Sequence, residues 1–189
     1  MDKIVAPNYV FARELRNKDN LRAIPADKPG YYKWWAQKDN LQTVLDRLEM
    51  DFDAVKHCLE VKEGYFCVYV GVAIKESVRA RLDWHVNQIH NPTNVKCGTL
   101  STLRQTISAI VGQNMMDTVA TNDFIDKLLI EYYLVDLPIK SQEAKETIGK
   151  WEKDLLNGNT LYLLNIADNH HPLAPKQALK QLRKSAKQI

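Results

Sequence analysis

Residues 65–72 read Tyr-Phe-Cys-Val-Tyr-Val-Gly-Val, which is the strongest strand pattern in the chain. The stretch is a continuous run of β-branched and aromatic residues, and these favour extended backbone. Because the pattern is apolar on both faces, we expect a central strand that is covered on both sides.

A second strand precedes this one. Residues 31–36 are rich in aromatic residues and fit a strand. Between the two strands, residues 40–59 carry apolar side chains at spacings of three and four, which predicts a helix, and Gly64 ends this segment. The two strands are therefore expected to form a hairpin with a helical insert at its tip.

The rest of the chain is predicted to be mostly helical. Ser101 is a typical helix N-cap, and Pro138 stops a third strand in which β-branched and aromatic residues cluster. The helices are expected at 8–20, 77–89, from Ser101 onward, at 141–156 and, as a basic helix or a frayed end, from Ala174; the third strand is expected at 128–137. This order predicts an α+β domain with a small sheet.

Composition excludes several classes of protein. With 189 residues, the chain can bury a core without disulfides or structural metals. Hydrophobic residues at 45% and charged residues at 26% exclude a disordered or fibrous chain. No apolar run approaches the roughly 18 residues of a membrane span, and the first residues lack a signal-peptide pattern. The three cysteines form no Cys-x-x-Cys pair, which predicts reduced thiols and a cytoplasmic protein without a membrane partner.

The charge is unevenly distributed. Five of the 26 lysines and arginines lie in residues 172–189, which hold no acid, so the rest of the chain has 21 bases against 23 acids. A basic tail suits an anionic partner such as nucleic acid. On charge alone, a solvated basic C-terminus explains the pattern equally well.

Residues with catalytic potential lie around the first two strands. Gly30-Tyr31-Tyr32 opens the first strand and Tyr69-Val70-Gly71 ends the second. Arg81 and His85 are four residues apart, so they are neighbours on one helix face. Glu152 lies in a later helix, and Asn165 follows it. Taken singly, each has an ordinary structural explanation: strand tyrosines that pack across a hairpin, an exposed helix pair or a packed histidine.

In this order, the residues resemble the GIY-YIG nuclease family over Pro29 to Asn165. His85 occupies a site that is His or Tyr in the family, and the histidine form is similar to the restriction-endonuclease branch. The resemblance implies a three-stranded antiparallel sheet flanked by helices, here with a helical insert in the first hairpin. It divides the chain into an N-terminal extension at 1–28, a nuclease domain at 29–171 with the insert at about 37–64, and a basic tail at 172–189.

The resemblance also implies a metal-dependent endonuclease that hydrolyses DNA phosphodiester bonds. Glu152 would be the single metal-binding carboxylate, for Mg²⁺ (or Mn²⁺), and Arg81 would grip a phosphate oxygen. Tyr32 would orient or deprotonate the attacking water, and Tyr69 would position the water or the phosphate. A phenol with a pKa of about 10 is a poor base at neutral pH. Tyr32 therefore needs a neighbour, and His85 and Lys75 are the two candidates. Asn165 would be structural or contact the substrate.

The pattern departs from the family at one position. Val72 follows Tyr-Val-Gly where some relatives carry a lysine, so Lys75 is an auxiliary candidate only. The alternative function is a catalytically weak or inactive GIY-YIG-like nucleic-acid-binding protein. A homodimer is expected if duplex cleavage needs two single-metal sites. In the tail, five residues are expected to contact DNA phosphates: Lys176, Lys180, Arg183, Lys184 and Lys187.

Overall fold

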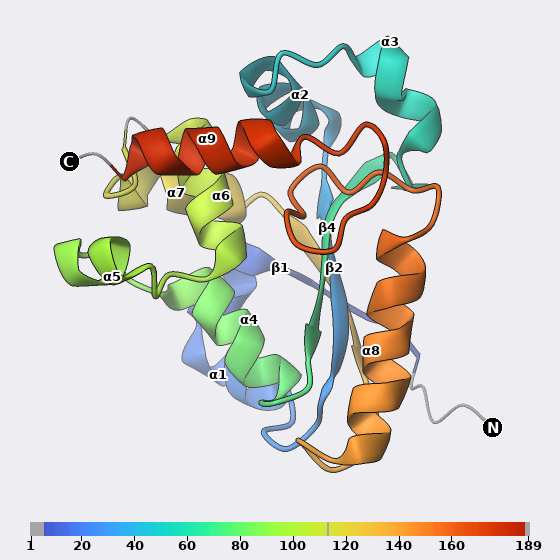
Figure 1. The fold of residues 1–189 in the computed structure, drawn as a ribbon. Helices are drawn as coiled ribbons and strands as arrows, with labels where there is room; N and C mark the ends of the chain where they lie inside the picture. The colour runs from blue at the N-terminus through green and yellow to red at the C-terminus, as the bar shows by residue number, and fades with distance from the viewer. Residues whose placement is uncertain (1–5, 113, 188–189) are drawn as a thin grey trace.

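The computed structural model describes residues 6–112 and 114–187, and its core is an antiparallel sheet in the order β1-β5-β2-β4-β3 (Figure 1). β2 (Gly30–Ala36) lies in the middle, paired with β5 (Leu129–Leu134) on one side and with β4 (Tyr65–Ala73) on the other. The α+β class and the β2–β4 hairpin are as predicted. β4 is covered on both faces, but the central strand is β2.

The expected number of strands was wrong, because five strands pair among the described residues rather than three. β1 (Asn8–Phe11) pairs with β5 and supplies partners for its outer backbone groups. β3 (Val61–Lys62) pairs antiparallel with the first two residues of β4. The helix expected at 8–20 is therefore wrong in its first third. The helical turns there are η1 (Ala12–Arg16) and α1 (Lys18–Ala23), and Asn17 caps α1.

The insert between β2 and β4 is helical, but it is not one helix. It forms α2 (Lys38–Arg47), α3 (Phe52–Val55) and η2 (Lys56–Cys58). Glu49 has a φ of 54°, in the left-handed region that a continuous right-handed helix cannot contain. The chain turns there, and the apolar face of α2 packs into the main core.

Helices cover both faces of the sheet. α4 (Val78–Asn87) and α8 (Gln142–Leu156) lie on opposite sides of the β2–β4 hairpin (Figure 1). α4 joins α2 and α6 (Thr102–Val111) in the larger core, whereas α8 packs on the other face. The side chain of Ser101 accepts a hydrogen bond from a backbone N–H group in the first turn of α6, as predicted, and Ser77 does the same for α4.

Two short helices were not predicted, namely α5 (Pro92–Cys97) and α7 (Thr118–Ile125). The tail forms α9 (Lys176–Ala186), which packs on α6 through the buried side chain of Leu179. Residues 1–5 of the predicted extension and 188–189 of the predicted tail lie outside the described residues. Within the described chain, no helix is both long and apolar enough to cross a membrane, and the three cysteines are unpaired.

Candidate active site

A β-bulge brings the two motif tyrosines to the same face of the sheet. Trp34 lies opposite Tyr69 and Trp35 opposite Cys67, so Val68 is an extra residue in β4. The extra residue shifts the alternation of side chains by one position, as bulges do. Tyr69 therefore faces the α4 side together with Tyr32, and its neighbour Val70 faces the α8 side.

The motif glycines are required by close approach. Gly71 lies directly opposite Tyr32 in the sheet register. A Cβ atom on Gly71 would lie 2.6 Å from the Tyr32 hydroxyl oxygen, and one on Gly30 would lie 1.9 Å from the carbonyl oxygen of Tyr133. Neither position has room for a side chain. The phenol of Tyr32 thus lies across the backbone of β4.

His85 from α4 meets this phenol. Its Nε2 atom lies 2.8 Å from the hydroxyl oxygen of Tyr32, and each residue is only 2% exposed. The rings of Tyr69 and Trp34 contact the imidazole edge-on. Burial lowers the pKa of His85 to about 3, helped by the charges of Arg81 and Arg104. His85 is therefore neutral at physiological pH, and of the two candidate neighbours it is the one whose ring lies within hydrogen-bond distance of Tyr32.

Arg81 lies one turn before His85 and is held from two sides. Its Nη2 atom is 2.6 Å from a carboxylate oxygen of Glu76, and its guanidinium carbon is 4.8 Å from the ring centroid of Trp84. Its Nε atom is buried and has no hydrogen-bond partner among the described residues. The guanidinium is thus fixed in orientation. Glu76 was not predicted from the sequence, because it lies outside α4 and follows no helical spacing.

Glu152 approaches the same tyrosines from α8, on the opposite face. Burial raises the pKa of Tyr69 to about 12, and the charge of Glu152 adds to this effect while Arg81 opposes it. Burial likewise raises the pKa of Tyr32 well above its ordinary value, with the same two charges acting in opposite directions. The charges of Arg81 and Glu152 therefore both act on both phenols. We call Tyr32, Tyr69, Arg81, His85 and Glu152 the tyrosine cluster.

A second carboxylate acts on Glu152. Burial raises the pKa of Glu152, the charge of Asp168 raises it further, and Arg81 lowers it. Asp168 is exposed and has a φ of 53°, in the left-handed region that Asp tolerates better than most residues. It lies in the loop after α8, where no periodic pattern could have identified it.

The cluster can be compared with known proteins. The family model described as the GIY-YIG catalytic domain matches residues 30–185, which is most of the chain. The chain belongs to the GIY-YIG family. Searches of curated proteins and of solved structures returned no match. GIY-YIG catalytic domains are nuclease domains, so nuclease activity is the general class of function that membership indicates.

In this GIY-YIG domain, Asn165 supports the strand that carries Tyr69. Its side-chain amide donates to the carbonyl oxygen of Val70 at 2.9 Å and accepts from the Val70 N–H at 3.0 Å. The backbone N–H of Leu164 bonds the carbonyl oxygen of Val68 at 2.9 Å. The side chain of Asn165 is therefore used for structure. Lys75 is exposed in the turn after β4, and its position there does not assign it a role beside Tyr32.

The basic residues of the tail lie on α9 at helical spacing. Lys180, Lys184 and Lys187 are exposed, and with Arg183 and Ile166 they line a hollow of about 400 Å³. Arg183 is half-buried, donates to the side-chain oxygen of Gln105 at 2.5 Å, and its charge acts on Tyr69. The basic face of α9 thus extends to the tyrosine cluster of the GIY-YIG domain. Lys176, at the start of α9, does not line this hollow.

Proposed function

We propose that the protein is a metal-dependent endonuclease that hydrolyses DNA phosphodiester bonds. The observation that carries the proposal is that the charges of Arg81 on α4 and Glu152 on α8 both act on the Tyr32 and Tyr69 phenols, and that the Tyr32 hydroxyl is held by His85 at 2.8 Å. A cation, a carboxylate and two oriented hydroxyls are the groups that stabilise a phosphoryl transition state and direct a water at it.

Arg81 is the residue that would bind the scissile phosphate. A guanidinium is always charged, and its planar fork matches two phosphate oxygens. Glu76 and the face of Trp84 already fix its orientation, so little side-chain entropy is lost when the phosphate binds. Charge developing on the non-bridging oxygens would meet a positive group that is already in place.

Glu152 fits a divalent cation. It is half-buried and has a raised pKa because burial and the nearby Asp168 carboxylate both oppose its charge. A cation relieves that repulsion, and a site with so few protein carboxylates leaves the ion most of its water. Mg²⁺ (or Mn²⁺), when bound, would polarise the phosphate and supply a more acidic water. Among the residues that the structure describes, no group of three or more acidic, His or Cys side chains forms an alternative metal site.

Tyr32 and His85 would act as an uncharged pair. The pKa of Tyr32 is raised and that of His85 is lowered, so a phenolate and an imidazolium are both disfavoured. Their hydrogen bond at 2.8 Å fixes the direction of the hydroxyl. We infer that Tyr32 orients the attacking water, with Tyr69 beside it, rather than carrying its proton away as a free phenolate.

The basic face of α9 would hold the DNA backbone next to the site. Lys180, Lys184 and Lys187 are exposed, and Arg183 links this face to Tyr69. Each phosphate contact releases counterions and contributes to affinity without reading sequence. Because one cluster can cut one strand, we also expect two copies of the chain to act on a duplex.

Cleavage of supercoiled plasmid DNA in the presence of Mg²⁺ tests the function. Glu152→Gln and Arg81→Ala should each slow cleavage about 100-fold, while DNA binding in EDTA is retained. Glu146→Gln and Arg79→Ala are matched controls, on the same two helices, that should cut at the wild-type rate. Equal cleavage by all four variants would identify a contaminant. Binding without cleavage by the wild type would favour the nucleic-acid-binding alternative.

A further inference from the structure

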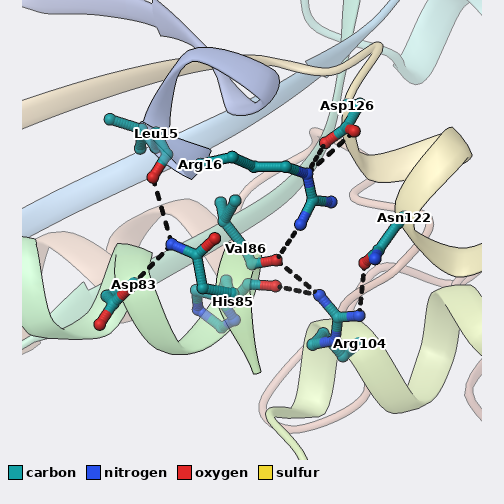
Figure 2. Close-up of polar contacts among 9 residues, drawn as sticks. Leu15, Arg16, Asp83, His85, Val86, Arg104, Asn122 and Asp126 are labelled. Atoms are coloured by element: carbon teal, nitrogen blue, oxygen red, sulfur yellow. Dashed lines mark hydrogen bonds and ion pairs between the residues drawn. The ribbon is translucent and has the colours of Figure 1, made fainter. Parts of the chain in front are cut away.

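A fully buried arginine lies outside the tyrosine cluster, in the first turn of α6. Arg104 is 0% exposed, and its guanidinium donates four hydrogen bonds. Figure 2 shows those to His85, Val86 and Asn122. The acceptors are Nε2 of His90 at 2.9 Å, the carbonyl oxygens of His85 at 3.1 Å and Val86 at 2.8 Å, and the side-chain oxygen of Asn122 at 2.7 Å. A guanidinium is costly to bury unless its donors are satisfied, and burial lowers the pKa of Arg104 to about 10.

The two carbonyls that Arg104 bonds belong to the last turn of α4. The final carbonyls of a helix have no partner within the helix, and they form the negative end of its dipole. Arg16 donates to the same Val86 oxygen at 3.0 Å and pairs with the Asp126 carboxylate at 2.7 Å (Figure 2). Two cations, from two separate elements, therefore anchor this end of α4.

The orientation of the Arg104 guanidinium is itself fixed. His90 Nδ1 lies 2.6 Å from the carbonyl oxygen of Met115, which can only accept a hydrogen bond. Nδ1 must then carry the proton, so Nε2 of the neutral ring accepts from Nε of Arg104. Asn122 holds the opposite end of the guanidinium. These hydrogen bonds hold the Arg104 side chain in a single orientation.

His85 joins this anchor to the tyrosine cluster. Its carbonyl oxygen accepts from Arg104, and its imidazole bonds the hydroxyl of Tyr32. We propose that Arg104 is a positioning residue of the nuclease site: it fixes the turn of α4 that places the His85 imidazole against Tyr32. The effect on catalysis rests on the proposed function, whereas the placement of His85 does not.

The positive charge of Arg104 has a second, smaller effect on His85. The imidazole is faced by Tyr32 and Trp34 from β2, by Tyr69 from β4, by Arg81 and Trp84 from its own helix, and by Arg104 from α6. Burial is the largest cause of its lowered pKa, followed by Arg81 and then Arg104. The phenols are uncharged at neutral pH. The two arginines are therefore the charges that disfavour an imidazolium.

Nuclear magnetic resonance of the ¹⁵N-labelled imidazoles tests the proposal without DNA or metal. Arg104→Met removes the charge at similar volume, and it should move the onset of His85 protonation upward, by up to roughly one pH unit, because one of the two charges that disfavour the imidazolium is lost. Arg16→Met is the matched control. It removes a cation from the same Val86 oxygen and should lower stability while leaving the His85 titration unchanged.

Arg104→Lys separates charge from geometry and guards against a methionine variant that fails to fold. It keeps the positive charge but loses the fork, so the His85 nitrogen shifts should change while the onset of protonation stays near that of the wild type. Cleavage by Arg104→Lys should fall about tenfold, mainly in kcat. Two outcomes would overturn the proposal. One is that the ¹⁵N chemical shifts of His85 in Arg104→Lys equal those of the wild type. The other is that His85 begins to protonate at the same pH in Arg104→Met as in Arg16→Met. Absence of cleavage by the wild type, with the His85 signals as expected, would instead sink the nuclease function alone.

Discussion

The tyrosine cluster and the basic face of α9 both bring charge to Tyr69, but they are built in opposite ways. In the cluster, Tyr32, Tyr69 and His85 are buried, and the charge of Arg81 acts on the pKa of each of them. On α9 and at its end, Lys180, Lys184 and Lys187 are exposed, and water screens them from one another. Losses in the cluster should therefore be large and non-additive, whereas losses on α9 should be small and should add.

The largest expected effect on the cluster comes from adding a side chain at Gly71. In Gly71→Ala the new Cβ would meet the buried Tyr32 hydroxyl at 2.6 Å, so the ring or the strand must move. We expect cleavage to slow about 100-fold and the free energy of unfolding to fall by about 1–3 kcal/mol. Plasmid cleavage and urea unfolding measure the two effects.

Gly149→Ala is the matched control, because a Cβ at that helical position meets nothing within 4 Å. It should leave the cleavage rate unchanged and raise stability by up to about 1 kcal/mol. If Gly71→Ala behaved like Gly149→Ala, the close approach of Tyr32 to β4 would not exist in solution.

The additive behaviour of α9 can be tested by salt. Replacing Lys180, Lys184 and Lys187 with glutamine removes three exposed cations beside the hollow. We expect the slope of log K against log salt to fall by about 3, so the loss of DNA affinity between 50 and 200 mM salt becomes roughly 40-fold smaller. Fluorescence anisotropy with a labelled duplex measures it.

The control removes the same charge elsewhere. Lys145, Lys150 and Lys153 are exposed on α8 and line a separate surface depression. Their triple glutamine variant should keep the wild-type slope. Equal slopes in both triple variants would mean that DNA does not lie along α9.

The smallest expected effect concerns the buried imidazole. The pKa of His85 is about 3 in the folded protein, against an ordinary value of 6.5, so only the unfolded chain binds this proton in between. Stability should therefore fall as the pH drops from 6.5 toward 3, by up to about 1.4 kcal/mol per pH unit from this group. His85→Gln should lose that contribution. Urea unfolding at pH 7, 6 and 5 measures the difference in slope.

His57→Gln, at an exposed position, is the control and should run parallel to the wild type. A His85→Gln curve that also ran parallel to the wild type would show that the imidazole is not buried as a neutral group.

The sequence predicted the β2–β4 hairpin because a strong local pattern marks its second strand. The members of the cluster were proposed from the order in which they occur and from the resemblance to the GIY-YIG family, because each one alone has an ordinary structural explanation. The apolar run at 65–72 and the spacing of Arg81 and His85 can be recognised in the sequence alone, without knowing which segments pack against them. β1 was missed because four residues carry no clear period, and their strand conformation depends on the free side of β5. The break in the insert depends on the left-handed backbone at Glu49, which no periodicity shows.

The residues around the cluster were harder to predict. An arginine in the first turn of a helix is usually exposed, and nothing local indicates that Arg104 bonds the end of another helix. Glu76 and Asp168 act on Arg81 and Glu152 from outside the helices that carry those residues. Such contacts are set by tertiary packing. A single sequence predicts which residues are suited to the chemistry better than it predicts what holds them.

The pairing of residues 164 and 165 with β4 also has a consequence for solubility. β4 is the most apolar strand, and beyond its two pairs with β3 its outer backbone groups would face solvent. Leu164 and Asn165 bond the Val68 and Val70 backbone there. An uncovered apolar strand edge is a template for a second chain. A chain that ends before Leu161 would therefore be expected to aggregate edge to edge. Residues 164 and 165 cover the outer edge of the strand that carries Tyr69.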